Sequence, residues 1–236
     1  MIHAIEVAPA ARRRSARLVQ IVDAALDLVT AHGLAGLTMQ RLADEVDLTP
    51  GALYRYFRSK DALIVAMQQR CLLEIGERLR RAQQEGPWPS APRPRALAEL
   101  LVAAATYVQL REEAPRVFAL VAATLNDPRP LVEDGEAARI IPVLESLLGE
   151  VAKLFAGASE VGALDDHSTP EVRTVLFWSA IQGVASTAKL RRLHESFSLE
   201  PLAREAARTL LVGFGASIED LDEANQTLRQ RKGTPS

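Results

Sequence analysis

The most constraining feature of this sequence is the stretch Thr38–Lys60, which reads TMQRLADEVDLTPGALYRYFRSK. Thr38 and Thr49 stand where helices would begin, and a threonine hydroxyl can accept a hydrogen bond from a first-turn amide. Pro50 follows at a first helical position, where its missing amide hydrogen is not needed. Asp47 stands where the chain must reverse, and aspartate tolerates the left-handed backbone better than most residues other than glycine. The stretch therefore predicts two short helices joined by a tight turn.

Apolar residues of this stretch recur at helical spacing and predict the buried sides of the two helices. These are Leu42, Ala43, Val46, Leu53 and Phe57. The second helix keeps a polar exposed side, which suits entry into the DNA major groove N-terminus first. We expect hydroxyl, glycine, amide and basic positions to contact bases or phosphates, with Ser59 capping the helix that follows. The expected DNA contacts of this stretch are Thr38, Gln40, Thr49, Pro50, Gly51, Tyr54, Arg55, Tyr56 and Lys60.

Four arginines precede the first predicted helix, which spans residues 15–32 and ends at Gly33. They are Arg12, Arg13, Arg14 and Arg17. Residues 1–11 are predicted to be a disordered arm, and an arginine cluster beside it could reach phosphates or an adjacent minor groove. A solvated tail is the alternative interpretation. The position of the arginine cluster next to a helix-turn-helix favours DNA contact.

The run TMQRLADEVDLTPGALYRYFRSKDAL resembles the DNA-binding module of the tetracycline-repressor (TetR) family of bacterial regulators. The resemblance begins near Arg14, includes IVDAALDLVTAHG as the first helix, and continues to about Leu73. Asp47 departs from the glycine that the family usually has in the turn. Beyond residue 73 the chain is similar to the family only in its helical architecture. The resemblance implies a homodimer, a palindromic operator, and a small-molecule effector that loosens the protein from DNA.

The rest of the chain shows helical patterns with no strand alternation, interrupted by the proline-rich segment 85–94 and a loop at 157–168. The helix predicted at 170–193 is apolar nearly all round, and the one at 199–217 carries an apolar stripe, so we expect both to pair with their copies in a second subunit. A protomer core is the alternative. The interface residues would be Val172, Leu176, Ser179, Gly183, Ser186, Leu199, Ala203, Ala206, Leu210 and Phe214.

Aromatic side chains of this body could line an apolar effector pocket among the helices, or they could simply fill the core. They are Tyr107, Phe118, Phe155, Phe177 and Trp178. Few charged residues fall on the inward stripes. We therefore expect an apolar or weakly polar effector.

Enzyme and metal signatures are poor. No phosphate-cradling glycine loop or nucleophile elbow is present. The adjacent Asp165, Asp166 and His167 read as a solvated loop, and Cys71 has no nearby histidine. We expect no catalytic residue, metal or cofactor. The single cysteine, and the absence of a signal-like N-terminus or a long apolar run, favour a cytoplasmic protein without a membrane span.

Together these observations predict an all-α fold, with a three-helix helix-turn-helix head joined to a helical effector-binding and dimerisation body. The predicted DNA-binding domain covers residues 12–73, with the motif at 38–57. The body covers 74–231 and a disordered tail covers 232–236. The predicted function is a DNA-binding transcriptional repressor, dimeric on an operator and released by an effector. The alternatives are a dimeric DNA-binding protein without an effector, and an enzyme or sensor whose head docks protein.

Overall fold

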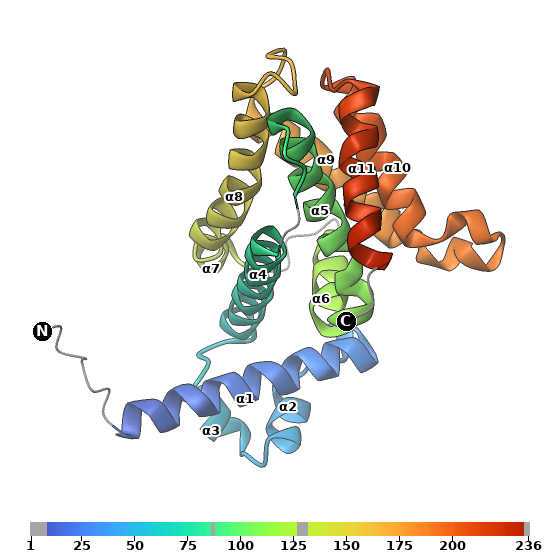
Figure 1. The fold of residues 1–236 in the computed structure, drawn as a ribbon. Helices are drawn as coiled ribbons and strands as arrows, with labels where there is room; N and C mark the ends of the chain where they lie inside the picture. The colour runs from blue at the N-terminus through green and yellow to red at the C-terminus, as the bar shows by residue number, and fades with distance from the viewer. Residues whose placement is uncertain (1–8, 86–87, 127–131, 234–236) are drawn as a thin grey trace, which may run out of the picture. The chain divides into compact units, whose positions relative to one another are not determined.

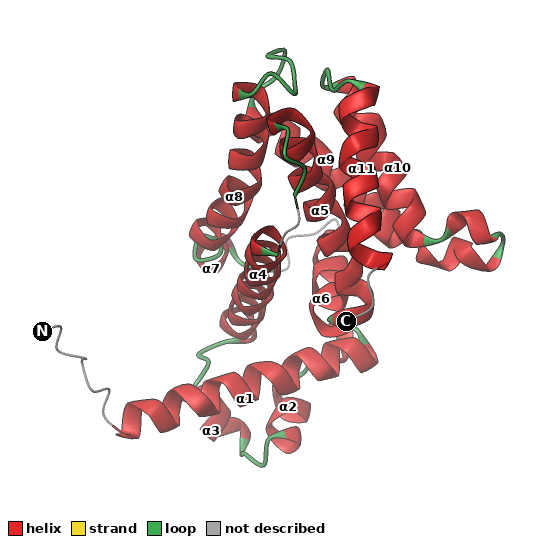
Figure 2. Ribbon diagram, viewed as in Figure 1, coloured by secondary structure: helices red, strands yellow, loops and turns green. Residues whose placement is uncertain are grey.

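Helices form every regular element of the computed structural model, which describes residues 9–85, 88–126 and 132–233. Within those residues Figure 2 shows helices and loops but no strand, so the predicted all-α class is confirmed. The helices are α1 (Pro9–His32), α2 (Met39–Glu45), α3 (Pro50–Tyr54), α4 (Lys60–Gln84), α5 (Pro92–Glu113), α6 (Pro115–Asn126), α7 (Asp134–Ala137), α8 (Ile141–Glu160), α9 (Pro170–Ser186), α10 (Leu199–Gly213) and α11 (Ile218–Gly233). Three short 3-10 segments join them: η1 (Leu34–Gly36), η2 (Ala188–Arg192) and η3 (Glu195–Phe197).

The backbone contacts divide the chain into two units. The head unit comprises the described residues of 1–71 and 115–141, and the body unit those of 72–114 and 142–236. Segment 115–141 therefore packs with the N-terminal helices, chiefly through α6 against α1. Nothing in the sequence pattern of that segment indicated this partnership.

Both ends of the described chain extend their helices further than the sequence pattern predicted. α1 begins at Pro9, so residues 9–11 are helical where a disordered arm was predicted. Pro9 suits a first helical position, and the alanines and arginines after it are good helix formers. α11 likewise includes residues 232 and 233 of the predicted tail. Residues 1–8 and 234–236 lie outside the described part.

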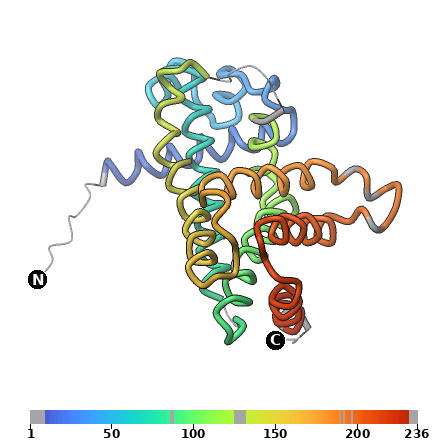
Figure 3. Tube along the Cα trace, turned by 90° about the horizontal axis from the view of Figure 1, so that it is seen from above, coloured from blue at the N-terminus to red at the C-terminus, as the bar shows by residue number. Residues whose placement is uncertain are grey.

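The body unit is organised around α5, which contacts α9, α10 and α11 (Figure 1). Its helical sequence is rich in alanine and leucine, and half of its residues are buried. Leu97 and Leu100 of α5 share a core with Leu211 of α10 and Leu221 of α11, and all four are fully buried. α9 ends at Ser186 and not at the predicted residue 193, because the chain turns there into η2. Figure 3 shows the chain leaving α9 through η2 and η3 before it returns as α10.

A buried arginine holds the loop between α8 and α9. Arg173 is 1% exposed, and its guanidinium donates to the hydroxyls of Ser168 and Ser159 and to the Asp165 carboxylate, at 2.9, 3.0 and 2.6 Å. The Asp165 amide in turn donates to the Phe214 carbonyl at 2.9 Å. The next residue, Gly215, has φ +94°, and a Cβ there would lie 3.0 Å from the Asp165 amide nitrogen. A glycine is therefore required at this corner.

Candidate nucleic-acid interface

The two predicted caps of the helix-turn-helix are confirmed. The Thr38 hydroxyl accepts a hydrogen bond from the Arg41 amide at 3.1 Å, at the start of α2. The Thr49 hydroxyl accepts one from the Ala52 amide at 3.2 Å, at the start of α3. Ser59 does the same for α4, accepting from the Ala62 amide at 3.0 Å. Each cap satisfies an amide that the helix itself leaves unpaired.

The turn between α2 and α3 has the geometry expected at Asp47, whose φ is +52°. The Leu48 amide donates to the Ala43 carbonyl at 2.9 Å, and the Asp47 amide points to the Asp44 carbonyl at 3.4 Å. This pair of bonds is a Schellman motif, which ends a helix with a left-handed residue. Aspartate adopts that conformation at lower cost than other non-glycine residues. The turn is therefore closed without the usual glycine.

The apolar side of both helices faces the interior, as the helical spacing predicted. Leu42, Ala43 and Leu53 are fully buried, and Phe57 is 7% exposed. Packing of these residues fixes which side of α3 faces solvent. Thr49, Gly51, Tyr54 and Arg55 are left exposed, while Pro50, Tyr56 and Lys60 are half-buried.

Gly51 has open space around it. A Cβ built on this residue would meet no atom within 4 Å, and its φ lies outside the left-handed region. Neither the packing of the head unit nor the backbone conformation therefore requires glycine here.

Two of the predicted DNA-contacting side chains are engaged within the head unit. Arg17 of α1 donates to the Val46 carbonyl at the end of α2 and to the Gln20 side chain at 3.1 Å. Gln40 donates to the Asp44 carboxylate at 2.9 Å, one turn along α2. Arg17 thus caps the end of α2 in this structure, and its predicted phosphate contact stays a prediction. Gln40 would have to leave Asp44 to contact a base.

The other arginines of the predicted arm lie on α1. Arg12, Arg13 and Arg14 are exposed helical residues, so the predicted flexible arm is corrected to a basic helix end. The Arg14 guanidinium lies over the ring of Tyr56, 5.8 Å from its centroid. This contact brings α1 and the residues just after α3 together, and it places two predicted phosphate contacts side by side.

Arg58 carries an interaction that sequence reasoning missed. Its guanidinium pairs with Glu136 of α7, with Nε donating to Oε1 at 3.0 Å. Arg139 donates to the other oxygen of Glu136 at 3.0 Å. Hydrogen bonding to Arg58, with a smaller part from Arg139, lowers the pKa of the Glu136 carboxyl despite its burial. The two partners are too far apart in sequence for any local pattern to reveal them.

The aromatic residues predicted to line an effector pocket do not share one site. Phe118 belongs to the head unit, and the other four to the body unit. Phe155 packs edge to face on Phe177 and Phe214, with ring centroids 5.5 and 5.9 Å apart, and is fully buried. Phe155 and Phe177 therefore fill the core, which was the alternative interpretation. Burial raises the pKa of the Tyr107 hydroxyl to about 12, and this hydroxyl donates to Gln182 at 2.5 Å.

The residues predicted at a dimer interface divide by helix. On α9 the predicted positions are all exposed, with Val172 and Leu176 each 49% exposed. Val175, also on α9, is 48% exposed and was not predicted. On α10, Ala203 is 2% exposed within its own body unit, which corrects its assignment. The remaining predicted positions, on α10 and at the residue that follows it, are partly buried against the same core: Leu199, Ala206, Leu210 and Phe214.

The loop of Asp165 and His167 is engaged internally. Asp165 accepts from Arg173, as described above, and lies 3.1 Å from the His167 imidazole. Within the ranges that the structure describes, no helix is both long and apolar enough to traverse a lipid bilayer.

Comparison with known proteins agrees with this geometry. Residues 21–67 match the profile of the tetR family of bacterial regulatory proteins. An uncharacterised HTH-type transcriptional regulator from the dhlA 5′ region of Xanthobacter autotrophicus is 38% identical over 69 residues, which cover 28% of this chain and 34% of the relative. The HTH-type transcriptional regulator BetI of Brucella canis is 31% identical over 85 residues, which cover 36% of this chain and 40% of BetI. The matches thus span well under half the length of these curated relatives.

The fold similarity extends further than the sequence similarity. The transcriptional regulator FadR from Bacillus subtilis, solved in complex with stearoyl-CoA, has a TM-score of 0.66 at 15% sequence identity. The alignment covers 83% of this chain and 98% of FadR. The body therefore shares its helical architecture with FadR, whereas similarity in sequence is concentrated in the head.

Proposed function

The chain belongs to the tetR family of bacterial regulatory proteins through its helix-turn-helix, and we propose that it represses transcription by binding a palindromic operator as a homodimer. The observation that carries this proposal is the exposed face of α3. Capping and packing fix that face outward, and it presents Thr49, Gly51, Tyr54 and Arg55. A small, open helix tip of this kind suits the major groove. The proposed DNA-binding domain remains residues 12–73, and the predicted body of 74–231 is corrected by the packing of segment 115–141 with the head unit.

Arg55 is the residue that we propose reads a base, because a guanidinium can pair with both acceptors of guanine. Arg14, Lys60 and the tyrosine hydroxyls would hold phosphates and set the orientation of the head. The sequence-independent part of the binding energy would come from these phosphate contacts, and it would weaken as salt rises.

The test is selection of bound genomic fragments by the purified protein, followed by titration of the selected site. The Arg55→Ala variant should lose about 1–3 kcal/mol on the selected site and much less on random DNA. Equal losses on both would make Arg55 a phosphate contact. Failure of the unaltered protein to bind any genomic fragment at low salt would contradict the proposal and favour a head that docks protein.

We propose that the exposed side of α9 is the centre of the dimer interface. Val172, Val175 and Leu176 are each about half exposed on one face, and Ser179 and Gly183 continue that face. Large apolar side chains beside small ones allow close helix approach, as in helical bundles. Two heads held about 34 Å apart would then meet successive major grooves of a palindrome. We also propose a cytoplasmic location, because a regulator that acts in this way must reach the DNA.

A small-molecule effector completes the proposal. The body shares its architecture with FadR, which was solved with stearoyl-CoA. A ligand that binds one arrangement of the dimer better than another would change the spacing of the heads and release DNA. The second candidate is a regulator without an effector, whose body serves only to dimerise. A thermal-shift screen in which no compound stabilises the protein would favour this second candidate.

A further inference from the structure

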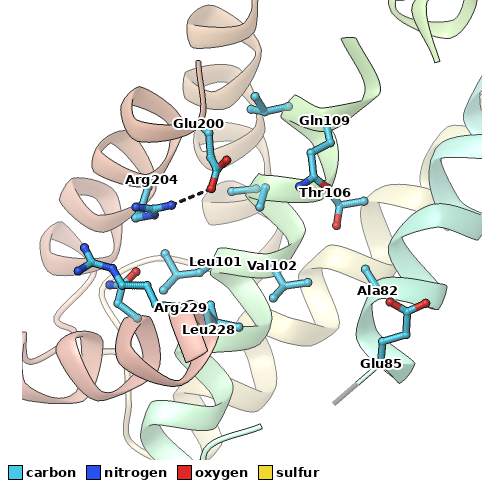
Figure 4. A pocket seen from close by; sticks show the side chains of 15 residues that line it. Ala82, Glu85, Leu101, Val102, Thr106, Gln109, Glu200, Arg204, Leu228 and Arg229 are labelled. Atoms are coloured by element: carbon cyan, nitrogen blue, oxygen red, sulfur yellow. Dashed lines mark hydrogen bonds and ion pairs between the residues drawn. The ribbon is translucent and has the colours of Figure 1, made fainter. Parts of the chain in front are cut away.

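A pocket of about 360 Å³ lies in the body unit, between α5, α10, α11 and the end of α4 (Figure 4). Its floor is apolar and includes Leu101, Val102 and Val108 of α5 and Leu228 of α11. The volume lies within the range of small-molecule sites. One water molecule occupies about 30 Å³ of liquid, so this pocket has room for about a dozen non-hydrogen atoms. None of the aromatic residues predicted to line an effector pocket is part of it.

The polar groups of this pocket lie around the floor. Arg204 and Glu200 form an ion pair across one turn of α10, with nitrogen and oxygen 2.8 Å apart, so their charges offset each other (Figure 4). Thr106 and Gln109 of α5 and Asn225 of α11 add neutral hydrogen-bonding groups. The ion pair and these neutral groups set no preference for the sign of a ligand, which leaves Glu85 and Arg229 as the other charged groups of the lining.

Arg229 differs from these groups. It is an exposed residue of α11 beside Leu228, and within the described ranges its guanidinium takes part in no ion pair. Figure 4 shows Arg229 and Glu85 at opposite ends of the pocket, with Leu101 and Val102 between them. An anion at the Arg229 end would therefore gain a charge-assisted hydrogen bond while its apolar part covers the floor.

We propose that this pocket binds a small monoanionic amphipathic carboxylate, with the apolar part over α5 and the carboxylate at Arg229. This pocket specifies the chemical class of the effector proposed above. It rests on the proposed function only for the consequence that ligand binding weakens DNA binding. Binding itself depends on the body unit alone.

The test uses three probes with one apolar body and three head groups: 4-phenylbutyrate, 4-phenylbutan-1-ol and 4-phenylbutylamine. Each is titrated into the full-length protein by calorimetry. The acid should bind about tenfold or more tightly than the alcohol, because hydrogen bonds to charged groups contribute more than neutral ones. The amine should bind most weakly. Arg229→Gln should reduce the affinity for the acid to that of the alcohol and leave the alcohol unchanged.

Two variants control this comparison. Arg70→Gln removes the same charge from an exposed position of α4 in the head unit and should change neither affinity. Ala105→Phe fills the pocket from a half-buried position on α5 and should abolish binding of both the acid and the alcohol. Circular dichroism and thermal melting confirm that each variant is folded.

The proposal is overturned if the three probes bind alike, or if Arg229→Gln leaves the preference for the acid intact. A change of oligomeric state in Ala105→Phe, measured by sedimentation, would also overturn it, because the pocket would then face a second copy. Operator binding is measured separately for every variant. A protein that binds no operator but still prefers the acid disproves the regulatory function while the pocket stands, and the reverse result disproves only the pocket.

Discussion

Arg58 and Glu136 stand 78 positions apart in the chain, yet the guanidinium of the first hydrogen-bonds the carboxylate of the second inside the head unit. Glu136 is only 7% exposed and also accepts from Arg139. The residues that follow α3 are thereby tied to α7. The exposed face of α3 is thus held partly by a segment that lies far outside the helix-turn-helix in sequence.

This ion pair predicts a pH dependence. The pKa of Glu136 in the folded protein lies below its usual value of 4.5, so the folded state binds fewer protons than the unfolded state. The stabilisation is complete above about pH 4.5 and is lost as pH falls through the lowered pKa. Between about pH 5 and 3, where carboxyl groups titrate, the free energy of unfolding in urea should therefore fall less for Glu136→Gln than for the unaltered protein.

Glu133→Gln is the matched control, because Glu133 is an exposed carboxylate just before α7. The change in the free energy of unfolding of Glu133→Gln with pH should match that of the unaltered protein. Identical pH profiles for Glu136→Gln and the unaltered protein would show that the ion pair does not contribute to stability.

Gly51→Ala should separate folding from DNA binding. The site is helical and open, so alanine should raise the free energy of unfolding by about 0.5–1 kcal/mol. The added methyl group should nevertheless weaken operator binding if α3 approaches the duplex closely. Gly149→Ala, at an equally open site in α8, should give a similar gain in stability and no loss of binding. Unchanged affinity in Gly51→Ala would place the DNA elsewhere.

Asp47 predicts an unusual order of stability among substitutions. Its φ of +52° favours glycine, so Asp47→Gly should keep or raise stability. Asp47→Val should lower it by about 1–2 kcal/mol, because a β-branched residue is strained in the left-handed region. Chemical unfolding measures both. A valine variant as stable as the aspartate protein would mean that the turn relaxes to another conformation.

The corner after α10 offers a matched pair of glycines. Gly215→Ala should destabilise the protein by more than about 1 kcal/mol, because the residue has φ +94° and its Cβ would press on Asp165. Gly213→Ala, two residues earlier, meets no atom within 4 Å and should be neutral or slightly stabilising. Thermal melting of the two variants under the same conditions distinguishes them, and equal melting temperatures would contradict the geometry.

Leu176→Arg tests the proposed dimer interface. The side chain is 49% exposed on α9, so the charge is tolerated in a single protomer but buried in a dimer. Dimerisation should weaken on the order of tenfold or more, because burying an unpaired charge is costly. Leu73→Arg changes a comparably exposed residue, 53% exposed on α4, and should not alter the sedimentation profile. Weakening in Leu73→Arg alone would move the interface to α4.

The features that sequence reasoning predicted best depend on interactions between residues that are close in sequence. Thr38 and Thr49 cap their helices because capping depends on an amide only three positions away. Asp47 takes the left-handed conformation because the chain reverses within its own neighbourhood. Such local rules act in the same way wherever the segment is placed.

The features that were missed depend on tertiary contacts. Arg17 reads as part of a basic arm, but the folded chain brings it to the Val46 carbonyl at the end of α2. Ala203 lies on the same stripe as its neighbours, and only packing against the core distinguishes it as buried. The partition of aromatics between the two units, with Phe118 in the head, follows from the partnership of α6 and α1.

The contact between Arg17 and the Val46 carbonyl shows that the end of α2 depends on α1. A synthetic peptide confined to residues 38–57 lacks that guanidinium and would fray at the end of α2. A shortened head that keeps this contact must therefore start upstream of residue 17.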